Sequence, residues 1–395
     1  MARAFLVVMD SVGIGGAPDA GTFFNGDLPD TGANTLAHVA QARSGGLRVP
    51  TLDALGLGAA LRLASGEVAE GLGAAPRGLW GAATARARGK DTTTGHWELA
   101  GLELPFEWHY FPDTRPAFPD EVVAAVTEAA GTGGILGNCH ASGTEIVTEL
   151  GQAHIETGWP ICYTSADSVF QIAAHEAHFG LERLLALCEA VAPMLHGMRV
   201  GRVIARPFVG ETPQTFARTG NRRDYALPPP GPTLCDRAQA EGRAVHGIGK
   251  IGDIFAMQGI DDVRKGSDAQ LMEHLARAVE EAGPGSLTFA NFVEFDSLYG
   301  HRRDPEGYAA ALERFDAGLG EVLPKLGPGD LMLITADHGN DPTWPGTDHT
   351  RERVPVLGAG VGNVAAGLVD FVDVAATVAA HLGLGWRGPG RSFLP

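Results

Sequence analysis

Residues 331–338 read Leu331-Met332-Leu333-Ile334-Thr335-Ala336-Asp337-His338, an apolar run that ends in two potential metal ligands. Such a run predicts a strand buried on both faces, the kind found in a parallel sheet. Two other runs end in the same way, because residues 5–9 precede Asp10 and residues 292–295 precede Asp296. In open α/β sheets, ligands bind at the carboxyl ends of the strands. We therefore expect three distant segments to meet at one edge of a sheet.

Three histidines accompany these aspartates. His338 follows Asp337 directly, and His349 lies eleven residues later. His301 lies five residues after Asp296. Three carboxylates and three imidazoles are enough to hold two divalent cations. Isolated structural Asp–His pairs are the alternative. Such pairs would not explain why all six residues follow the expected strand ends in a chain that also has a candidate nucleophile, in the threonine-rich segment Gly89–Glu98.

Composition and charge fit an acidic enzyme. The chain has 395 residues, 44% of them hydrophobic, and a formal net charge of −17. This charge argues against a nucleic-acid-binding surface and favours solubility. We expect no membrane span, no signal peptide and a cytoplasmic location. No metal-ligand or redox spacing relates the cysteines, which we expect to be reduced structural thiols: Cys139, Cys162, Cys188 and Cys235.

Strands and helices alternate along most of the chain. Asp304-Pro305 predicts a helix start, and apolar residues then recur at helical spacing from Tyr308 to Leu326. We also expect helices at 271–279 and 372–382, and strands at 286–295 and 354–357. This alternation predicts a layered α/β fold, with a mainly parallel sheet sandwiched by helices.

The middle of the chain, residues 106–227, contributes none of the expected metal ligands. We expect strands near 159–164 and 199–205, and a helix near 182–191. A stiff boundary follows at Pro228–Pro232. We therefore predict a discontinuous dimetal core at 1–105 and 228–395, with a smaller α/β domain at 106–227 inserted into it. The sequence of residues 45–76 predicts no particular arrangement of helices and strands.

A threonine-rich segment, Gly89–Glu98, contains the candidate nucleophile. A hydroxyl beside a metal ion can attack, because the cation stabilises the alkoxide. The alternative is a turn in which the threonines make only local hydrogen bonds. His96 could orient this segment, bind phosphate or serve the structure alone.

Eight segments of the chain resemble the phosphopentomutase family of the alkaline phosphatase superfamily. The Ala-Asp-His-Gly motif at 336–339 marks only the superfamily, whereas Asp-Thr-x-Thr-Gly-His-Trp-Glu at 91–98 and the motifs of residues 106–227 are more specific. The segments span nearly the whole chain: Val7–Gly15, Gly89–Glu98, Ala141–Glu145, Tyr163–Val169, Arg202–Phe208, Gly300–Pro305, Thr335–Asp341 and Gly346–Glu352.

The resemblance implies an alkaline-phosphatase-like core with a cap domain, and an isomerase of nucleoside salvage and pentose metabolism. It would exchange α-D-ribose 1-phosphate with the 5-phosphate, or the 2-deoxyribose pair, through a 1,5-bisphosphate. Thr92 would be the phosphorylated residue and also the fourth protein ligand of the Mn²⁺ that Asp10, Asp337 and His338 hold. Glucose 1,6-bisphosphate or ribose 1,5-bisphosphate would act as primer. The implied ligands are Asp10, Asp337 and His338 for one Mn²⁺, and Asp296, His301 and His349 for the other; zinc also suits these ligand types.

The distal phosphate and the sugar need further partners. Lys250 is one of only four lysines and lies among glycines, as phosphate-binding lysines often do. Arg202, Arg206 and Arg222 are further candidates for phosphate, with surface ion pairs as the alternative. Ser165 and Asp167 are candidates for sugar hydroxyls, although Asp167 could be a turn residue. The oligomeric state stays open.

Two other functions remain possible at this point. A metal-dependent phosphatase could use the same core, and a catalytically silent sugar-phosphate-binding protein could retain it. Cofactor-independent phosphoglycerate mutase is related in chemistry, but it uses a serine nucleophile in a different local motif. The complete ligand set and the Thr92 segment favour the pentose phosphate mutase.

Overall fold

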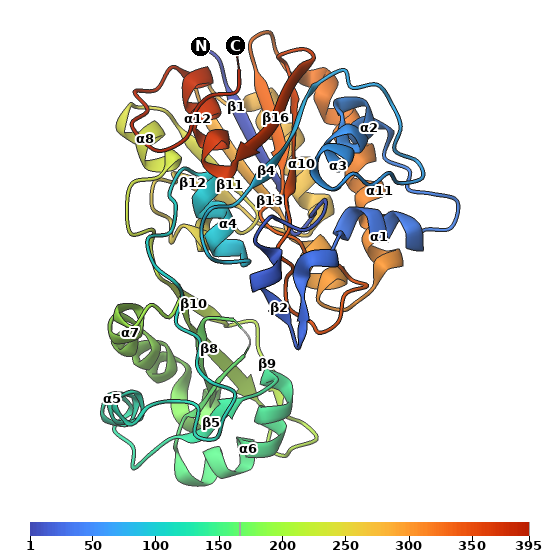
Figure 1. Cartoon of the computed structure of the whole chain (residues 1–395). Helices are drawn as coiled ribbons and strands as arrows, with labels where there is room; N and C mark the ends of the chain where they lie inside the picture. Colours follow the sequence, from blue (N-terminus) through green and yellow to red (C-terminus); the bar gives the residue numbers. More distant parts are fainter. Residues whose placement is uncertain (166, 395) are drawn as a thin grey trace. The chain divides into compact units, whose positions relative to one another are not determined.

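The computed structural model describes residues 1–165 and 167–394, so that Ala166 of the Tyr163–Val169 segment lies outside it. The described chain divides into two compact units, each with its own sheet (Figure 1). Unit 1 comprises residues 1–105 and 228–395, and unit 2 comprises residues 106–227.

An eight-stranded sheet forms the centre of unit 1. Seven strands run in the same direction, and only β15 is antiparallel to its neighbours. Every residue of β1, β13 and β14 is buried, which confirms the prediction of strands covered on both faces. The strand order is β12 (Asp262–Arg264), β11 (Val245–Ile248), β13 (Leu287–Phe292), β1 (Ala4–Met9), β14 (Leu331–Thr335), β15 (Val354–Ala359), β4 (Leu79–Thr84) and β16 (Val364–Asp370).

The register of the three central strands brings their carboxyl ends level. Met9 of β1 pairs with Phe292 of β13, and Val8 pairs with Thr335 of β14. Asp10 and Asp337 therefore follow neighbouring strand ends, as predicted.

The strand that we expected to reach residue 295 ends at Phe292, so the prediction was wrong at that end. The backbone N–H groups of Val293 and Glu294 donate to the Asp268 carboxylate, at 3.2 Å each, instead of continuing the ladder. Asp296 consequently lies on a π-helical turn, η4 (Phe295–Gly300).

Helices cover both faces of this sheet (Figure 1). One layer contains α1 (Thr35–Ala42), α2 (Pro50–Leu55), α3 (Leu57–Ser65), α10 (Asp268–Glu281) and α11 (Pro305–Val322). The other contains α4 (Thr92–Leu99), α8 (Leu234–Ala240), α9 (Ile251–Ile254) and α12 (Phe371–Leu382). Together with the sheet, these layers confirm the predicted α/β class.

The helix after Asp304 begins as predicted, because the Asp304 side chain accepts a hydrogen bond from the backbone N–H of Gly307. It does not continue to Leu326. A 3₁₀ turn, η5 (Leu323–Lys325), follows Val322 and contains Pro324, whose missing N–H cannot continue the helical hydrogen bonds.

Short elements complete unit 1. Residues 45–76, for which the sequence predicted no arrangement, form α2, α3 and a loop. Before them lie two 3₁₀ turns, η1 (Ala20–Thr22) and η2 (Asp30–Gly32), and the two-stranded ribbon of β2 (Phe24–Asn25) and β3 (Leu28–Pro29).

Unit 2 has a mixed sheet with its own hydrophobic core. Its strand path is β10 (Arg223–Ala226), β8 (Arg202–Val209), β7 (Val169–His175), β6 (Ile161–Thr164) and β5 (Leu136–His140), and β9 (Ala217–Arg218) pairs with β8. Its helices are α5 (Asp120–Ala130), α6 (Gly143–Thr157) and α7 (Leu181–Gly197), with the π turn η3 (Glu176–Gly180) before α7. The elements expected near 159–164, 182–191 and 199–205 are present as β6, α7 and β8.

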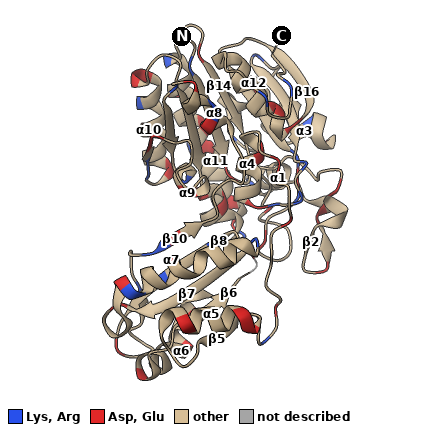
Figure 2. Cartoon of the chain, turned by 90° about the vertical axis from the view of Figure 1, so that its left-hand side faces the viewer, with Lys and Arg blue, Asp and Glu red and all other residues tan. Residues whose placement is uncertain are grey.

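Acidic residues are spread over helices and loops of both units (Figure 2). Among the described residues, no helix combines the length and the apolar character that crossing a bilayer requires. All four cysteines are buried and unpaired, in agreement with the expected reduced thiols.

Candidate metal centre

Asp10, Asp337 and His338 form a buried group at the carboxyl end of the central strands. His338 Nε2 lies 3.5 Å from Asp10 Oδ1 and 3.3 Å from Asp337 Oδ2. The other ring nitrogen, Nδ1, donates to the Gly339 carbonyl at 3.1 Å. This hydrogen bond leaves the Nε2 lone pair directed at the two carboxylates, as a metal ligand requires.

A second group consists of Asp296, His301 and His349. Asp296 Oδ2 lies 3.2 Å from His301 Nε2, and Asp296 Oδ1 lies 3.3 Å from His349 Nε2. The two Nε2 atoms are 3.2 Å apart. His301 Nδ1 donates to the Thr347 carbonyl at 2.7 Å, so its Nε2 also faces the group with a lone pair.

The two groups adjoin each other. His338 can also share a cation with Asp296 and His349, because their ligand atoms lie within 4.8 Å of one another. The rings of His338 and His349 are 4.0 Å apart between centroids. The structure therefore brings together all six residues that the sequence suggested as metal ligands.

The donor set fits divalent cations. Asp10 Oδ1 and Asp337 Oδ2 are buried and accept no hydrogen bond among the described residues. Burial, together with the neighbouring Asp337 and Asp296, raises the pKa of Asp10 well above its ordinary value. Burial also opposes ionisation of Asp337, but His338 and His96 outweigh it and lower its pKa. Buried carboxylates of this kind need a positive partner, and a metal ion supplies one.

Thr92 is the first residue of α4 and lies beside the first group. Its Oγ1 is 3.2 Å from His338 Nε2. The preceding residue, Asp91, caps the helix by accepting from the backbone N–H of Thr94 at 3.0 Å. Local hydrogen bonding therefore exists in this segment, but it involves Thr94 and leaves the Thr92 hydroxyl facing the metal ligands. A helix N-terminus also favours an anion such as a phosphoryl group.

His96 ties α4 to the metal ligands. Its Nδ1 donates to the Thr92 carbonyl at 2.9 Å and lies 3.1 Å from Asp337 Oδ2. Its Nε2 accepts from Asn291 Nδ2 at 3.2 Å, and the same amide nitrogen donates to Asp10 Oδ2 at 2.9 Å. The sequence reasoning missed Asn291, although a lone amide inside the buried apolar strand β13 is an available signal.

Arg303 and Asn340 are two further residues that the sequence reasoning missed. Arg303 Nη1 donates to Asn340 Oδ1 at 2.6 Å, and Asn340 Nδ2 donates to Asp296 Oδ1 at 2.7 Å. Both residues lie inside the quoted motifs, but their position in a motif does not indicate what their side chains contact.

Lys250 is exposed and stands at the N-cap position of the short helix α9, where its side chain makes no capping hydrogen bond. Its charge acts to lower the pKa of Asp10, against the larger effect of burial. The lysine is therefore close enough to the metal centre to affect its electrostatics.

The five remaining predicted substrate residues belong to unit 2. Arg202 lies 3.4 Å from Asp167 and 3.8 Å from Asp224, and Arg222 donates to Asp224 at 2.6 and 2.7 Å. Arg206 donates to Gln171 at 2.9 Å, and Ser165 is half-buried. The ion-pair alternative thus describes Arg202 and Arg222 in this structure.

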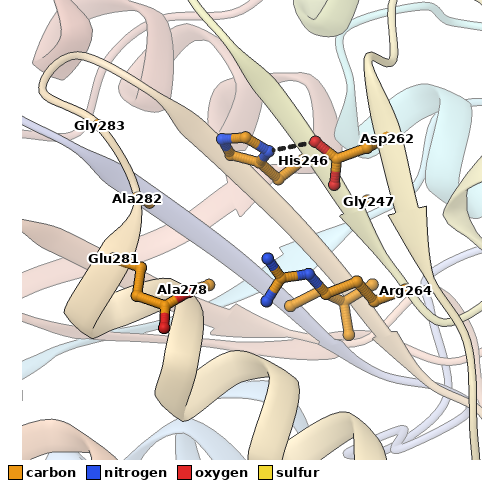
Figure 3. Close-up of a pocket in the computed structure, with 9 residues that line it drawn as sticks. His246, Gly247, Asp262, Arg264, Ala278, Glu281, Ala282 and Gly283 are labelled. Atoms are coloured by element: carbon orange, nitrogen blue, oxygen red, sulfur yellow. Dashed lines mark hydrogen bonds and ion pairs between the residues drawn. The ribbon is translucent and has the colours of Figure 1, made fainter.

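Two other features lie outside the metal centre. His175, His178 and Glu211 approach one another, but both nitrogens of His175 are engaged with backbone groups. A pocket lies between β11, β12 and the end of α10, where His246 is 2.7 Å from Asp262 and the Arg264 side chain extends toward α10 (Figure 3). None of the metal-ligand candidates lines this pocket.

Comparison with known proteins supports the same kind of site. Residues 2–385 match the model of the metalloenzyme superfamily. A phosphopentomutase from Chelativorans sp. (strain BNC1) is 56% identical over 410 residues, covering 100% of this chain and 98% of its own. A phosphopentomutase from Agrobacterium fabrum is 54% identical and covers 100% of both chains. That from Chromohalobacter salexigens is 54% identical, covering 100% of this chain and 96% of its own.

Proposed function

Because this chain belongs to the phosphopentomutase family, we propose that it is an isomerase that interconverts α-D-ribose 1-phosphate and D-ribose 5-phosphate, and the corresponding 2-deoxyribose phosphates. The observation that carries the proposal is the position of the Thr92 hydroxyl at a helix N-terminus, 3.2 Å from a histidine of the first ligand group.

We assign the two ligand groups to two Mn²⁺ ions. Asp10, Asp337 and His338 would hold one, and Asp296, His301 and His349 the other. A mixed shell of carboxylate and imidazole suits manganese, and zinc is the alternative. When bound, the ions would neutralise the phosphoryl oxygens and polarise the phosphorus toward attack.

Thr92 would carry the phosphoryl group between the two sugar positions. The free sugar hydroxyl attacks phosphorus, the bond from phosphorus to Thr92 Oγ1 breaks, and the proton lost by the hydroxyl balances the one gained by Thr92. The resulting 1,5-bisphosphate reorients, and Thr92 attacks its other phosphoryl group with the reverse proton balance. A bisphosphate such as glucose 1,6-bisphosphate would load Thr92 initially.

The chain's other residues would position Thr92 and the sugar phosphate. His96 holds the Thr92 carbonyl, which fixes the first turn of α4 relative to Asp337. Lys250 is a candidate for the phosphate that is not being transferred. In unit 2, Arg202, Arg206 and Arg222 are candidates for phosphate, and Ser165 and Asp167 for sugar hydroxyls. The ion pairs that Arg202 and Arg222 make would have to exchange for the ligand.

Unit 2 has a proposed task in excluding water. Water competes with the sugar for the phosphoryl group, so a mutase must protect the bisphosphate while it reorients. We propose that unit 2 is the cap that provides this protection. A phosphatase, the second candidate function, would release the phosphoryl group to water instead. Location in the cytoplasm is also part of the proposal and is supported by the four unpaired cysteines.

The decisive experiment follows ribose 5-phosphate by phosphorus NMR, with Mn²⁺ and glucose 1,6-bisphosphate present. We expect ribose 1-phosphate to form and little inorganic phosphate. Thr92→Ala should abolish the exchange, whereas Thr93→Ala, the matched control, should retain it. Release of inorganic phosphate as the main product would favour the phosphatase.

A further inference from the structure

We infer that Arg303 is the positioning residue of the second ligand group, and that it organises this group without contacting a metal ion or the substrate. The inference rests on the proposed function, because it concerns the metal site that Asp296, His301 and His349 are proposed to form. It adds a residue that controls the occupancy of one of the two ions.

The Arg303 side chain donates five hydrogen bonds to three separate segments. Nε donates to the Gly346 carbonyl at 2.7 Å, and Nη2 donates to the Asp348 carbonyl at 3.0 Å. Nη1 donates to the Gly300 carbonyl at 2.9 Å, to Asn340 Oδ1 at 2.6 Å and to the Asp341 carbonyl at 3.2 Å. One planar guanidinium thus joins the end of η4, the turn after β14 and the 346–348 loop.

Three of these contacts, those to Gly300, Asp348 and Asn340, lead directly to a residue of the ligand group. Gly300 precedes His301, and Asp348 precedes His349. The 346–348 loop also provides the Thr347 carbonyl that accepts from His301 Nδ1. Asn340, held through its Oδ1, donates to Asp296 Oδ1. Asp296 and His301 belong to η4 and its C-terminal cap, whereas His349 follows the 346–348 loop, and Arg303 fixes these two segments relative to one another.

The backbone supports a specific role. Arg303 has φ of 55°, in the left-handed region that disfavours residues with a Cβ atom. A non-glycine residue holds this conformation where the surrounding contacts determine it. The five hydrogen bonds supply such contacts, whereas the neighbouring Arg302 is exposed, and its side chain makes no hydrogen bond or ion pair in the described part of the chain.

These features define a matched set of variants. Arg303→Gly removes the guanidinium without adding backbone strain, because glycine tolerates positive φ. Arg303→Lys keeps the charge, but a single nitrogen cannot reach carbonyls on three segments. Arg302→Ala removes an adjacent guanidinium that contacts none of them.

The test measures Mn²⁺ binding to the full chain by titration calorimetry and by electron paramagnetic resonance of the free ion. We expect two ions in the unaltered protein and in Arg302→Ala. In Arg303→Gly and Arg303→Lys, one ion should bind about 10- to 100-fold more weakly, as is typical when outer-shell partners of a metal ligand are lost. The other ion should be unaffected.

Measurements on the His349→Ala variant identify which of the two ions is affected. His349→Ala should bind only the ion of the first group, and adding Arg303→Gly to it should leave that affinity unchanged. The inference is overturned if the Arg303 variants bind both ions with unchanged affinity, bind both ions more weakly to the same extent, or do not fold. Fewer than two ions in the unaltered protein would instead contradict the proposed function.

Discussion

Replacing Glu98 by Gln should remove a large part of the pH dependence of folding stability. Glu98 is fully buried on α4, the helix that begins with Thr92. Burial raises its pKa from 4.5 to about 7, even though its carboxylate accepts from the backbone N–H groups of Arg86 at 2.7 Å and Ala87 at 3.0 Å. The folded protein therefore binds this proton more tightly than the unfolded chain does.

The sign follows from that difference. A raised folded pKa gives a stabilising contribution that is fully present below about pH 4.5 and is lost as the pH rises through about 7. Ionisation of Glu98 alone should lower the free energy of unfolding by roughly 2 to 3 kcal/mol between pH 5 and pH 8. Gln cannot ionise, so the Glu98→Gln variant should not lose this stability as the pH rises. The substitution also weakens one of the two hydrogen bonds from the backbone N–H groups, but it does so at every pH.

The assay is urea unfolding at pH 5 and at pH 8, at the same Mn²⁺ concentration, for both proteins. Other groups that titrate in this range are present in both and cancel in the comparison. The drop in unfolding free energy from pH 5 to pH 8 should be smaller in Glu98→Gln by roughly 2 to 3 kcal/mol. Equal drops would mean that Glu98 is already ionised at pH 5 in the folded protein, and the argument from burial would fail.

Two further predictions concern the metal centre. Asn291→Leu should weaken the ion bound by Asp10, Asp337 and His338 by about 10- to 100-fold, measured by calorimetry, because Asp10 and His96 lose their shared amide. Thr288→Val in the same strand is the control, since the Thr288 hydroxyl makes no hydrogen bond among the described residues, and equal effects of the two changes would refute the role of Asn291. His349→Ala should bind one ion fewer and slow the exchange by orders of magnitude; full metal content at an unchanged rate would exclude His349 as a ligand.

The central strands were predictable because strands that are buried on both faces consist almost entirely of apolar residues. The runs that end at Met9 and Thr335 are wholly apolar apart from Thr335, and each lies between two covered faces. The strands β4 and β16 were not predicted. β4 contains glycine and two alanines, and β16 is a half-exposed edge strand, so neither has a continuous apolar run or a regular alternation.

Some of the metal-ligand residues were predictable because they lie close to the ends of these strands. The residues that hold the ligands in position were not predictable. Asp10 directly follows one of these apolar strands, and Asp337 lies two residues after the end of another. Asp296 lies near these residues as predicted, although it belongs to the π turn η4 and does not directly follow a strand. Asn291 and Arg303 act through hydrogen bonds between segments distant in sequence, and such pairings become visible only in three dimensions.

The most direct measurement of the central claim is mass spectrometry of the peptide that contains Thr92, after incubation of the protein with Mn²⁺ and glucose 1,6-bisphosphate. We expect one phosphoryl group on Thr92, and its loss from the peptide when excess ribose 5-phosphate is added. Turnover without phosphorylation of Thr92, or with the phosphoryl group on Thr93 or Thr94, would contradict the account.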